Sequence, residues 1–159
     1  MRGLVLFVAG ILVGTAVQTT VAQNDAFVLN HVGLAVPNVA EAAKYYTDTL
    51  GYREAFRNTN PQGQPVSIYM QISRTTFLEL QQANAERPVG LTHYGLHVEN
   101  MKSAVERFRA NGATVSDPTG PSAFSGAVLA NVTVPDGPRI ELAELGPNSL
   151  QRKAADNWK

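Results

Sequence analysis

The chain has 159 residues, with 13 basic and 13 acidic side chains and a formal net charge of +0. This length fits one domain of ordinary size, or two half-domains that share a core. A balanced charge without a basic cluster longer than a pair argues against a nucleic-acid partner. The absence of cysteine excludes disulfides, thiolate metal sites and a cysteine nucleophile.

The first residues have the pattern of an export signal. Arg2 precedes an apolar run from Leu4 to Val17, and small and polar residues ending at Ala22 follow. We expect a signal peptide over residues 1–22 and therefore a periplasmic or secreted protein. The alternative is an uncleaved anchor that tethers the protein to a membrane, because the run approaches the length of a membrane-spanning helix.

Residues 28–82 predict a strand, a helix and three further strands. In the first strand, 28–36, apolar residues alternate with His31, Gly33 and Ala35, which places these three on one face. A helix follows, with Asn38 as its N-cap and Gly51 as its stop. The three further strands are expected near 53–57, 66–73 and 75–82.

Residues 91–146 repeat this plan after a polar connection at 83–90. The expected elements are a strand at 92–98, a helix at 101–110, and strands near 113–116, 127–134 and 139–145. The Gly/Pro/Ser-rich stretch 117–126 is expected to be a mobile loop near the mouth of a site. A short terminal helix is possible in the tail, residues 147–159.

The two halves are related by a fixed offset of 62 residues. "NHVGLAVPN" at 30–38 and "THYGLHVEN" at 92–100 share five of nine residues, which pairs His31 with His93. The same offset pairs Glu79 with Glu141 on the fourth strands. Alternation places all four side chains away from the faces that pack against the helices. If the open faces of two such sheets face each other, two imidazoles and two carboxylates meet at one point.

Two nitrogen and two carboxylate ligands suit a divalent transition metal, namely zinc, nickel, cobalt, iron or manganese, rather than calcium or magnesium. Four protein ligands around an octahedral ion leave positions for water or substrate, which is typical of a catalytic site. The alternative is a duplicated fold that keeps these residues for packing without an ion.

The stretches "LNHVGLAVPNV", "TFLEL", "THYGLHVEN" and "VPDGPRIEL" resemble the vicinal oxygen chelate superfamily of glyoxalases, extradiol dioxygenases and bleomycin-resistance proteins. The resemblance covers residues 28–146 and implies two βαβββ modules, 28–82 and 91–146, with a metal in a cleft between them. It implies His31, Glu79, His93 and Glu141 as the metal ligands. This set is most similar to that of glyoxalase I, where a ligand glutamate also moves a proton.

Other side chains are expected near the same cleft. His97 lies four residues after His93. It is a candidate to contact a metal ligand or to act as a general acid/base close to the metal. The alternative is that it only lines the wall of the cleft. Tyr69 and Gln71 on the third strand, with their counterparts Asn131 and Thr133, are candidates to orient a polar ligand. Arg139 is placed to contact Glu141 or a substrate carboxylate.

We therefore expect an α+β fold of two βαβββ modules, assembled as a homodimer. The favoured function is an exported metalloenzyme that chelates adjacent oxygens of a small polar substrate, with Glu141 or Glu79 moving a proton in a lyase or isomerase reaction. The alternatives are an iron-dependent dioxygenase and a ligand-sequestering protein of the bleomycin-resistance type. The sequence lacks the arginine and asparagine pattern that glutathione-dependent glyoxalases usually show, so the resemblance does not imply a glutathione substrate.

Overall fold

A computed structural model describes residues 27–159, so the expected signal peptide lies outside the described residues. The elements of the first half are β1 (Val28–Val36), α2 (Val39–Leu50), β2 (Arg53–Thr59), β3 (Pro65–Gln71) and β4 (Phe77–Gln82). Those of the second half are β5 (Gly90–His97), α3 (Met101–Ala110), β6 (Thr114–Val115), β7 (Val128–Thr133) and β8 (Arg139–Glu144), followed by α4 (Leu150–Asp156) in the tail. The predicted order of strands and helices is confirmed.

Both long helices begin where the sequence predicts them. Asn38 has an extended backbone, and its side chain accepts hydrogen bonds from the backbone N–H groups of Ala40 and Glu41. Asn100 caps α3 in the same way through Ser103 N–H. Gly51 ends α2 with a φ of 71°, a left-handed conformation that favours glycine. Local capping chemistry therefore sets the helix boundaries in both modules.

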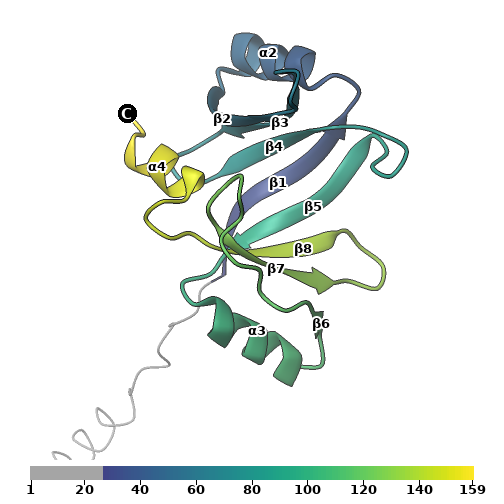
Figure 1. The fold of residues 1–159 in the computed structure, drawn as a ribbon, viewed down its shortest axis with the longest axis vertical. Helices are drawn as coiled ribbons and strands as arrows, with labels where there is room; N and C mark the ends of the chain where they lie inside the picture. The colour runs from purple at the N-terminus through teal and green to yellow at the C-terminus, as the bar shows by residue number, and fades with distance from the viewer. Residues whose placement is uncertain (1–26) are drawn as a thin grey trace, which may run out of the picture.

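The eight strands within residues 27–159 form one sheet in the order β2-β3-β4-β1-β5-β8-β7-β6. Each module has its first strand parallel to its fourth, β1 beside β4 and β5 beside β8. The modules join edge to edge through the antiparallel pair β1 and β5, which Figure 1 shows at the centre of the sheet. The fold class is confirmed, but the halves are one continuous sheet rather than two separate sheets that face each other.

Helices α2 and α3 each cover one half of the sheet. Val39 and Ala43 of α2 pack with Ile68, Met70 and Leu80 in one core cluster. In the second module, residues of α3 pack with strand residues in an equivalent cluster that includes Val98, Met101, Val105, Val132 and Leu142. The strand residues that alternate with these apolar side chains lie on the opposite face, which leaves that face of the sheet available for a site.

Two segments cross to the first module on the open face. One is the loop between β6 and β7 of the second module, and the other is α4 in the tail. The loop between β6 and β7 carries Phe124, whose ring lies 5.8 Å from that of Phe56 on β2. Helix α4 reaches β2 and β3, where Gln71 donates a hydrogen bond to Ala154 C=O. These crossing segments cover part of the open face. Figure 1 shows α4 beside the first module.

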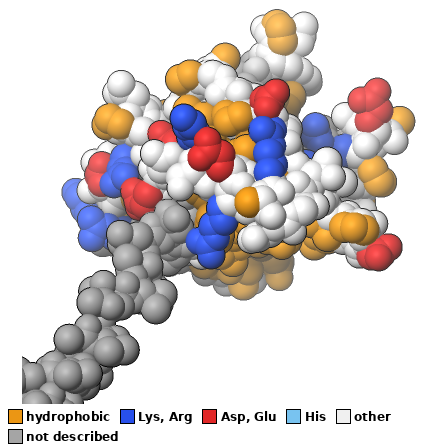
Figure 2. Space-filling model, turned by 90° about the horizontal axis from the view of Figure 1, so that it is seen from below, with side chains coloured by type: hydrophobic (Ala, Val, Ile, Leu, Met, Phe, Trp, Pro, Cys, Tyr) orange, Lys and Arg blue, Asp and Glu red, His pale blue; other side chains and the backbone are white. Residues whose placement is uncertain are grey.

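The face of the molecule seen from below carries no dominant charge. Figure 2 shows basic and acidic side chains interspersed on the face seen from below, among apolar ones. Within residues 27–159, no helix is both long enough and apolar enough to cross a membrane.

Candidate metal centre

Four side chains predicted from the 62-residue offset converge on the open face of the sheet. His31 Nε2 lies 3.0 Å from His93 Nε2 and 3.4 Å from Glu141 Oε1. His93 Nε2 lies 3.2 Å from Glu79 Oε2. His31 is 0% exposed and His93 is 1% exposed. All four residues come from one chain, because the pairing of β1 with β5 brings the two modules together within it.

The glycine two residues after each histidine makes this approach possible. In the β1 and β5 pair, His31 lies opposite Gly95, and Gly33 lies opposite His93. A Cβ atom added at Gly95 would lie 2.0 Å from His31 Cε1, and one added at Gly33 would lie 2.3 Å from His93 Cε1. Both glycines therefore leave room for the imidazole of the opposite strand. The repeated His-x-Gly pattern has a packing reason that operates across the two strands.

The residue before each histidine determines which ring nitrogen faces the cluster. Asn30 Nδ2 donates to Thr75 C=O, so Asn30 Oδ1 accepts from His31 Nδ1 at 2.9 Å. Thr92 Oγ1 donates to Gln81 Oε1 and therefore accepts from His93 Nδ1, also at 2.9 Å. When the rings are neutral, both Nε2 atoms consequently carry lone pairs that point into the cluster.

These two polar residues reach the rings because the strands are irregular there. The register of β1 and β5 shifts between Leu29 and His31, and again between Gly33 and Leu34. The first shift leaves Asn30 as an extra residue on β1, and the second leaves Thr92 as an extra residue on β5. Such bulges re-aim side chains and are common beside functional sites. Periodicity alone does not predict them.

The convergent atoms fit a metal ion. Two imidazole lone pairs and two carboxylate oxygens are all acceptors, and a cation satisfies them together. Ligands about 2.1 Å from a transition metal lie about 3.0 Å apart in octahedral and about 3.4 Å apart in tetrahedral geometry. The separations of three neighbouring pairs, His31–His93, His93–Glu79 and His31–Glu141, run from 3.0 to 3.4 Å. His31, His93 and Glu141 offer ligand atoms that all lie within 4.8 Å of one another, and Glu79 adjoins them through His93.

The two glutamates have different neighbours. Arg139 donates to Glu141 Oε2 at 3.3 Å and also to Asn131 Oδ1. Burial alone would raise the pKa of Glu141. When the imidazoles are protonated, however, a hydrogen bond from His31 and the charges of His31 and His93, together with the charge of Arg139, lower this pKa below its ordinary value. Glu141 is therefore held as a carboxylate, and Arg139 contacts it as the sequence predicts.

Glu79 instead has a phenol as its neighbour. Tyr69 is buried and hydrogen-bonds to Glu79, and its ring lies 5.6 Å from that of His31. Burial raises the pKa of Tyr69 well above 10.0, and the charges of Glu79 and Glu141 raise it further. Tyr69 therefore remains a neutral hydrogen-bond donor to Glu79 across the ordinary pH range.

A polar pocket of about 420 Å³ opens beside Glu79. Its walls include Asn58 and Gln81 from the first module, Arg87 from the connection after β4, and Phe124 from the crossing loop. The ring of Phe124 also packs at a tilt against that of Tyr69, with centroids 6.3 Å apart. The loop at 117–126 therefore lies at the mouth of the site, as the sequence predicts, while its mobility stays a prediction.

The remaining candidates lie elsewhere. His97 lines a different pocket, beneath α4, and its Nε2 lies 3.9 Å from Glu99. Gln71 binds Arg53 and the carbonyls of Arg74 and Ala154, so it attaches α4 rather than orienting a ligand. Thr133 is exposed.

Sequence reasoning missed four residues that contribute to the site, Asn30, Thr92, Gln81 and Phe124. One signal was present in the sequence, since a side chain able to form hydrogen bonds directly precedes each of the paired histidines.

Curated relatives of the chain are lactoylglutathione lyases. It is 28% identical over 141 residues to "Probable lactoylglutathione lyase, chloroplastic" of Arabidopsis thaliana, a match that covers 80% of this chain and 39% of that protein. The chain thus spans less than half the length of the Arabidopsis protein. It is 29% identical over 125 residues to the lactoylglutathione lyase of Salmonella typhimurium, covering 73% of this chain and 91% of the relative.

Solved structures share the fold. Methylmalonyl-CoA epimerase from Mycobacterium tuberculosis superposes with a TM-score of 0.65 at 21% identity, covering 83% of this chain and 96% of the epimerase. The 2,3-dioxygenase LapB from Pseudomonas sp. KL28 superposes with a TM-score of 0.62 at 22% identity, covering 74% of this chain and 42% of LapB. The family model of the Glyoxalase/Bleomycin resistance protein/Dioxygenase superfamily matches residues 30–128. The chain therefore belongs to this superfamily, the vicinal oxygen chelate group that its repeated motifs resemble.

Proposed function

We propose that this protein is a metal-dependent enzyme that acts on a small polar substrate in a glyoxalase-like lyase or isomerase reaction. His31, Glu79, His93 and Glu141 are the proposed ligands of one divalent transition metal. The observation that carries the proposal is the convergence of these four side chains beside an open polar pocket. The facing atoms of His31 and His93, of His93 and Glu79, and of His31 and Glu141 are 3.0 to 3.4 Å apart. The lactoylglutathione lyases among its relatives support the reaction class.

A divalent transition metal bound there would supply a Lewis acid that polarises adjacent oxygens of the substrate. The residues of the chain then bind the substrate and move its proton. Glu79 faces the pocket, so its carboxylate is the group we assign to proton transfer. The Tyr69 hydroxyl orients that carboxylate. Glu141 is paired with Arg139 and keeps its charge, so its role is to hold the metal.

The lining of the pocket favours a polar substrate. Arg87 is the cation among the residues that line it, and the amides of Asn58 and Gln81 add hydrogen-bonding groups. An anionic or hydroxylated substrate suits such walls. Export and dimer formation are further proposals, which rest on the N-terminal sequence pattern and on the family resemblance respectively.

The first experiment is elemental mass spectrometry of the purified protein without a histidine tag, beside the His93→Ala and Glu141→Gln double variant. We expect about one equivalent of a transition metal in the wild type and its loss in the double variant. Absence of metal after reloading with zinc, nickel and iron would overturn the metalloenzyme proposal. It would favour the ligand-sequestering alternative.

The second experiment separates the roles of the two glutamates. Metal-loaded protein is screened with 2-oxoaldehydes in the presence of thiols, and with catechols under oxygen to test the dioxygenase alternative. On an accepted oxoaldehyde, Glu79→Gln is expected to reduce kcat by about 10²-fold or more, as loss of a general base does. Glu86→Gln, an exposed acid in the loop after β4, is the matched control and should be unaffected. An unchanged kcat in Glu79→Gln with its metal retained would refute the assignment.

A further inference from the structure

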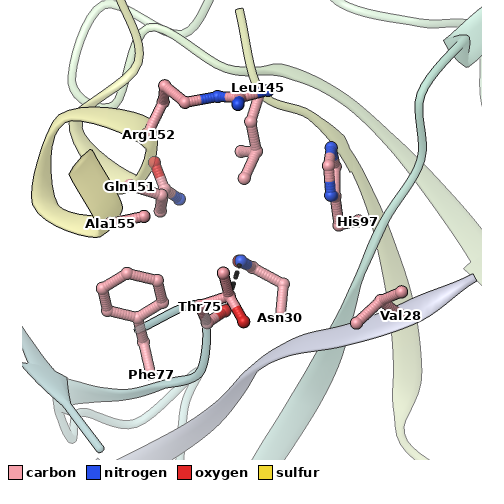
Figure 3. A pocket seen from close by; sticks show the side chains of 9 residues that line it. All are labelled: Val28, Asn30, Thr75, Phe77, His97, Leu145, Gln151, Arg152 and Ala155. Carbon is pink, nitrogen blue, oxygen red and sulfur yellow. Dashed lines mark hydrogen bonds between the residues drawn. The ribbon is translucent and has the colours of Figure 1, made fainter. Parts of the chain in front are cut away.

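A second pocket, of about 80 Å³, lies beneath α4 at the end of the open face where His97 is found. Figure 3 shows its walls, with the apolar side chains of Val28, Phe77 and Leu145 around the space. Gln151 and Arg152 reach it from α4. It is separate from the pocket beside Glu79, because the residues that line the two pockets do not overlap.

Gln151 has an unusual environment for a carboxamide. The residue is 1% exposed, and its Oε1 is fully buried without a hydrogen-bond partner. Figure 3 shows its nitrogen turned toward the pocket. An unpaired buried amide is costly, and most buried polar side chains have partners. A carboxylate cannot satisfy the buried Oε1, because both are acceptors. The Nε2 donor on the pocket side, however, has no hydrogen-bond partner within residues 27–159, and a ligand oxygen in the pocket would accept from it.

The mouth of the pocket is lined by groups that attract anions. Arg152 extends over the space in Figure 3, with His97 on the opposite wall. Among the described residues, no carboxylate lies within ion-pair distance of Arg152. Glu99 lies 3.9 Å from His97, but its side chain is 79% exposed, so solvent screens its charge. The cation of Arg152 is therefore available to a ligand at the mouth.

Size and polarity together define the class of ligand. The pocket of about 80 Å³ exceeds the roughly 30 Å³ share of one water molecule and is smaller than the roughly 150 Å³ that accommodates benzene. Its interior is apolar and its mouth is cationic. We propose that this pocket binds a short-chain carboxylic acid, with its alkyl group against Phe77 and its carboxylate between Arg152 and Gln151.

The test uses butyrate as the probe and butyramide as its uncharged counterpart. Binding to the full chain is measured by calorimetry after the metal is removed with a chelator, so that carboxylate binding to a metal does not contribute. We expect butyrate to bind at least tenfold more tightly than butyramide, since a hydrogen bond to a charged partner is worth that much. Arg152→Gln should abolish the difference, whereas Lys153→Gln, which removes the adjacent charge on the same helix, should preserve it.

Three results would overturn the proposal. Equal affinity for butyrate and butyramide would show that the cation is not used. Butyrate binding that survives Arg152→Gln but is lost in Arg87→Gln would place the acid in the other pocket. A crystal structure with butyrate that contains only ordered water beside Gln151 would show that solvent satisfies the amide.

Discussion

Gly95→Ala tests whether the metal centre depends on the close approach of β1 and β5. The backbone of Gly95 has no left-handed conformation, so alanine is allowed there and by itself would stabilise the strand by about 0.4–1 kcal/mol. The new Cβ, however, would lie 2.0 Å from His31 Cε1 and 2.6 Å from His31 Nε2. The ring would have to move by about 1.4 Å to reach an ordinary van der Waals separation of about 3.4 Å.

Movement of the His31 ring should lower both the free energy of unfolding and the affinity for the metal. His31 is 0% exposed and its Nδ1 is held by Asn30 at 2.9 Å, so displacement breaks this hydrogen bond and shifts Nε2 away from Glu141. Overpacking in a core costs about 1–3 kcal/mol, so after the gain of about 0.4–1 kcal/mol in the strand the net loss lies between about 0 and 2.6 kcal/mol, with its middle at about 1–2 kcal/mol. Displacement of a metal ligand by this amount should weaken metal binding at least as much as loss of its supporting hydrogen bond, about 10- to 100-fold.

The assays are urea denaturation of the metal-free protein and calorimetric titration with the native metal. Gly120→Ala is the matched control, because a Cβ there meets nothing within 4 Å and its φ is not positive. We expect a loss of about 1–2 kcal/mol and weaker metal binding in Gly95→Ala alone. If Gly95→Ala had the same free energy of unfolding as Gly120→Ala and bound metal as tightly as the wild type, the argument that glycine makes room for the imidazole would be refuted.

Three further outcomes are expected. Thr92→Val removes the acceptor for His93 Nδ1 while keeping the side-chain shape, and should weaken metal binding by about 10- to 100-fold by calorimetry, with Thr133→Val as the exposed control. The raised pKa of Tyr69 favours its neutral form in the folded state, so the free energy of unfolding should fall as pH rises above 10.0. Tyr69→Phe should reduce that fall in denaturation curves measured across this range. Phe124→Ala should lower the free energy of unfolding by about 1–2 kcal/mol in urea, because the tilted ring contacts with Phe56 and Tyr69 are lost.

Much of the fold could be predicted because its signals are local. Alternation in "VLNHVGLAV" placed the apolar residues on the α2 side, where Val32, Leu34 and Val36 now pack. Asn38 and Gly51 bound α2 through capping chemistry that involves only nearby backbone groups. The way in which the halves join was not predictable from such signals. Whether two sheets face each other or share an edge depends on contacts between residues about 60 positions apart.

The candidate site was partly predictable for a related reason. A duplicated chain keeps equivalent positions in equivalent places, so the offset alone grouped His31 with His93 and Glu79 with Glu141. Strand alternation did not predict the roles of Asn30 and Thr92, because both residues lie at bulges, where the two-residue period is broken. His97 follows that period, yet it lines a separate pocket beneath α4. The tail helix that encloses this pocket lies outside the repeated pattern.

The sequence by itself determined the two modules, the faces of their strands and the identity of four acceptor side chains, because side-chain periodicity and capping are short-range properties of the backbone. Only the tertiary structure decided that β1 pairs with β5 within one chain, that each glycine receives the opposite imidazole, and that Glu79 faces a pocket while Glu141 faces Arg139. These features depend on strand register and on crossing segments. Long-range packing sets both, and no local pattern in the chain encodes the result.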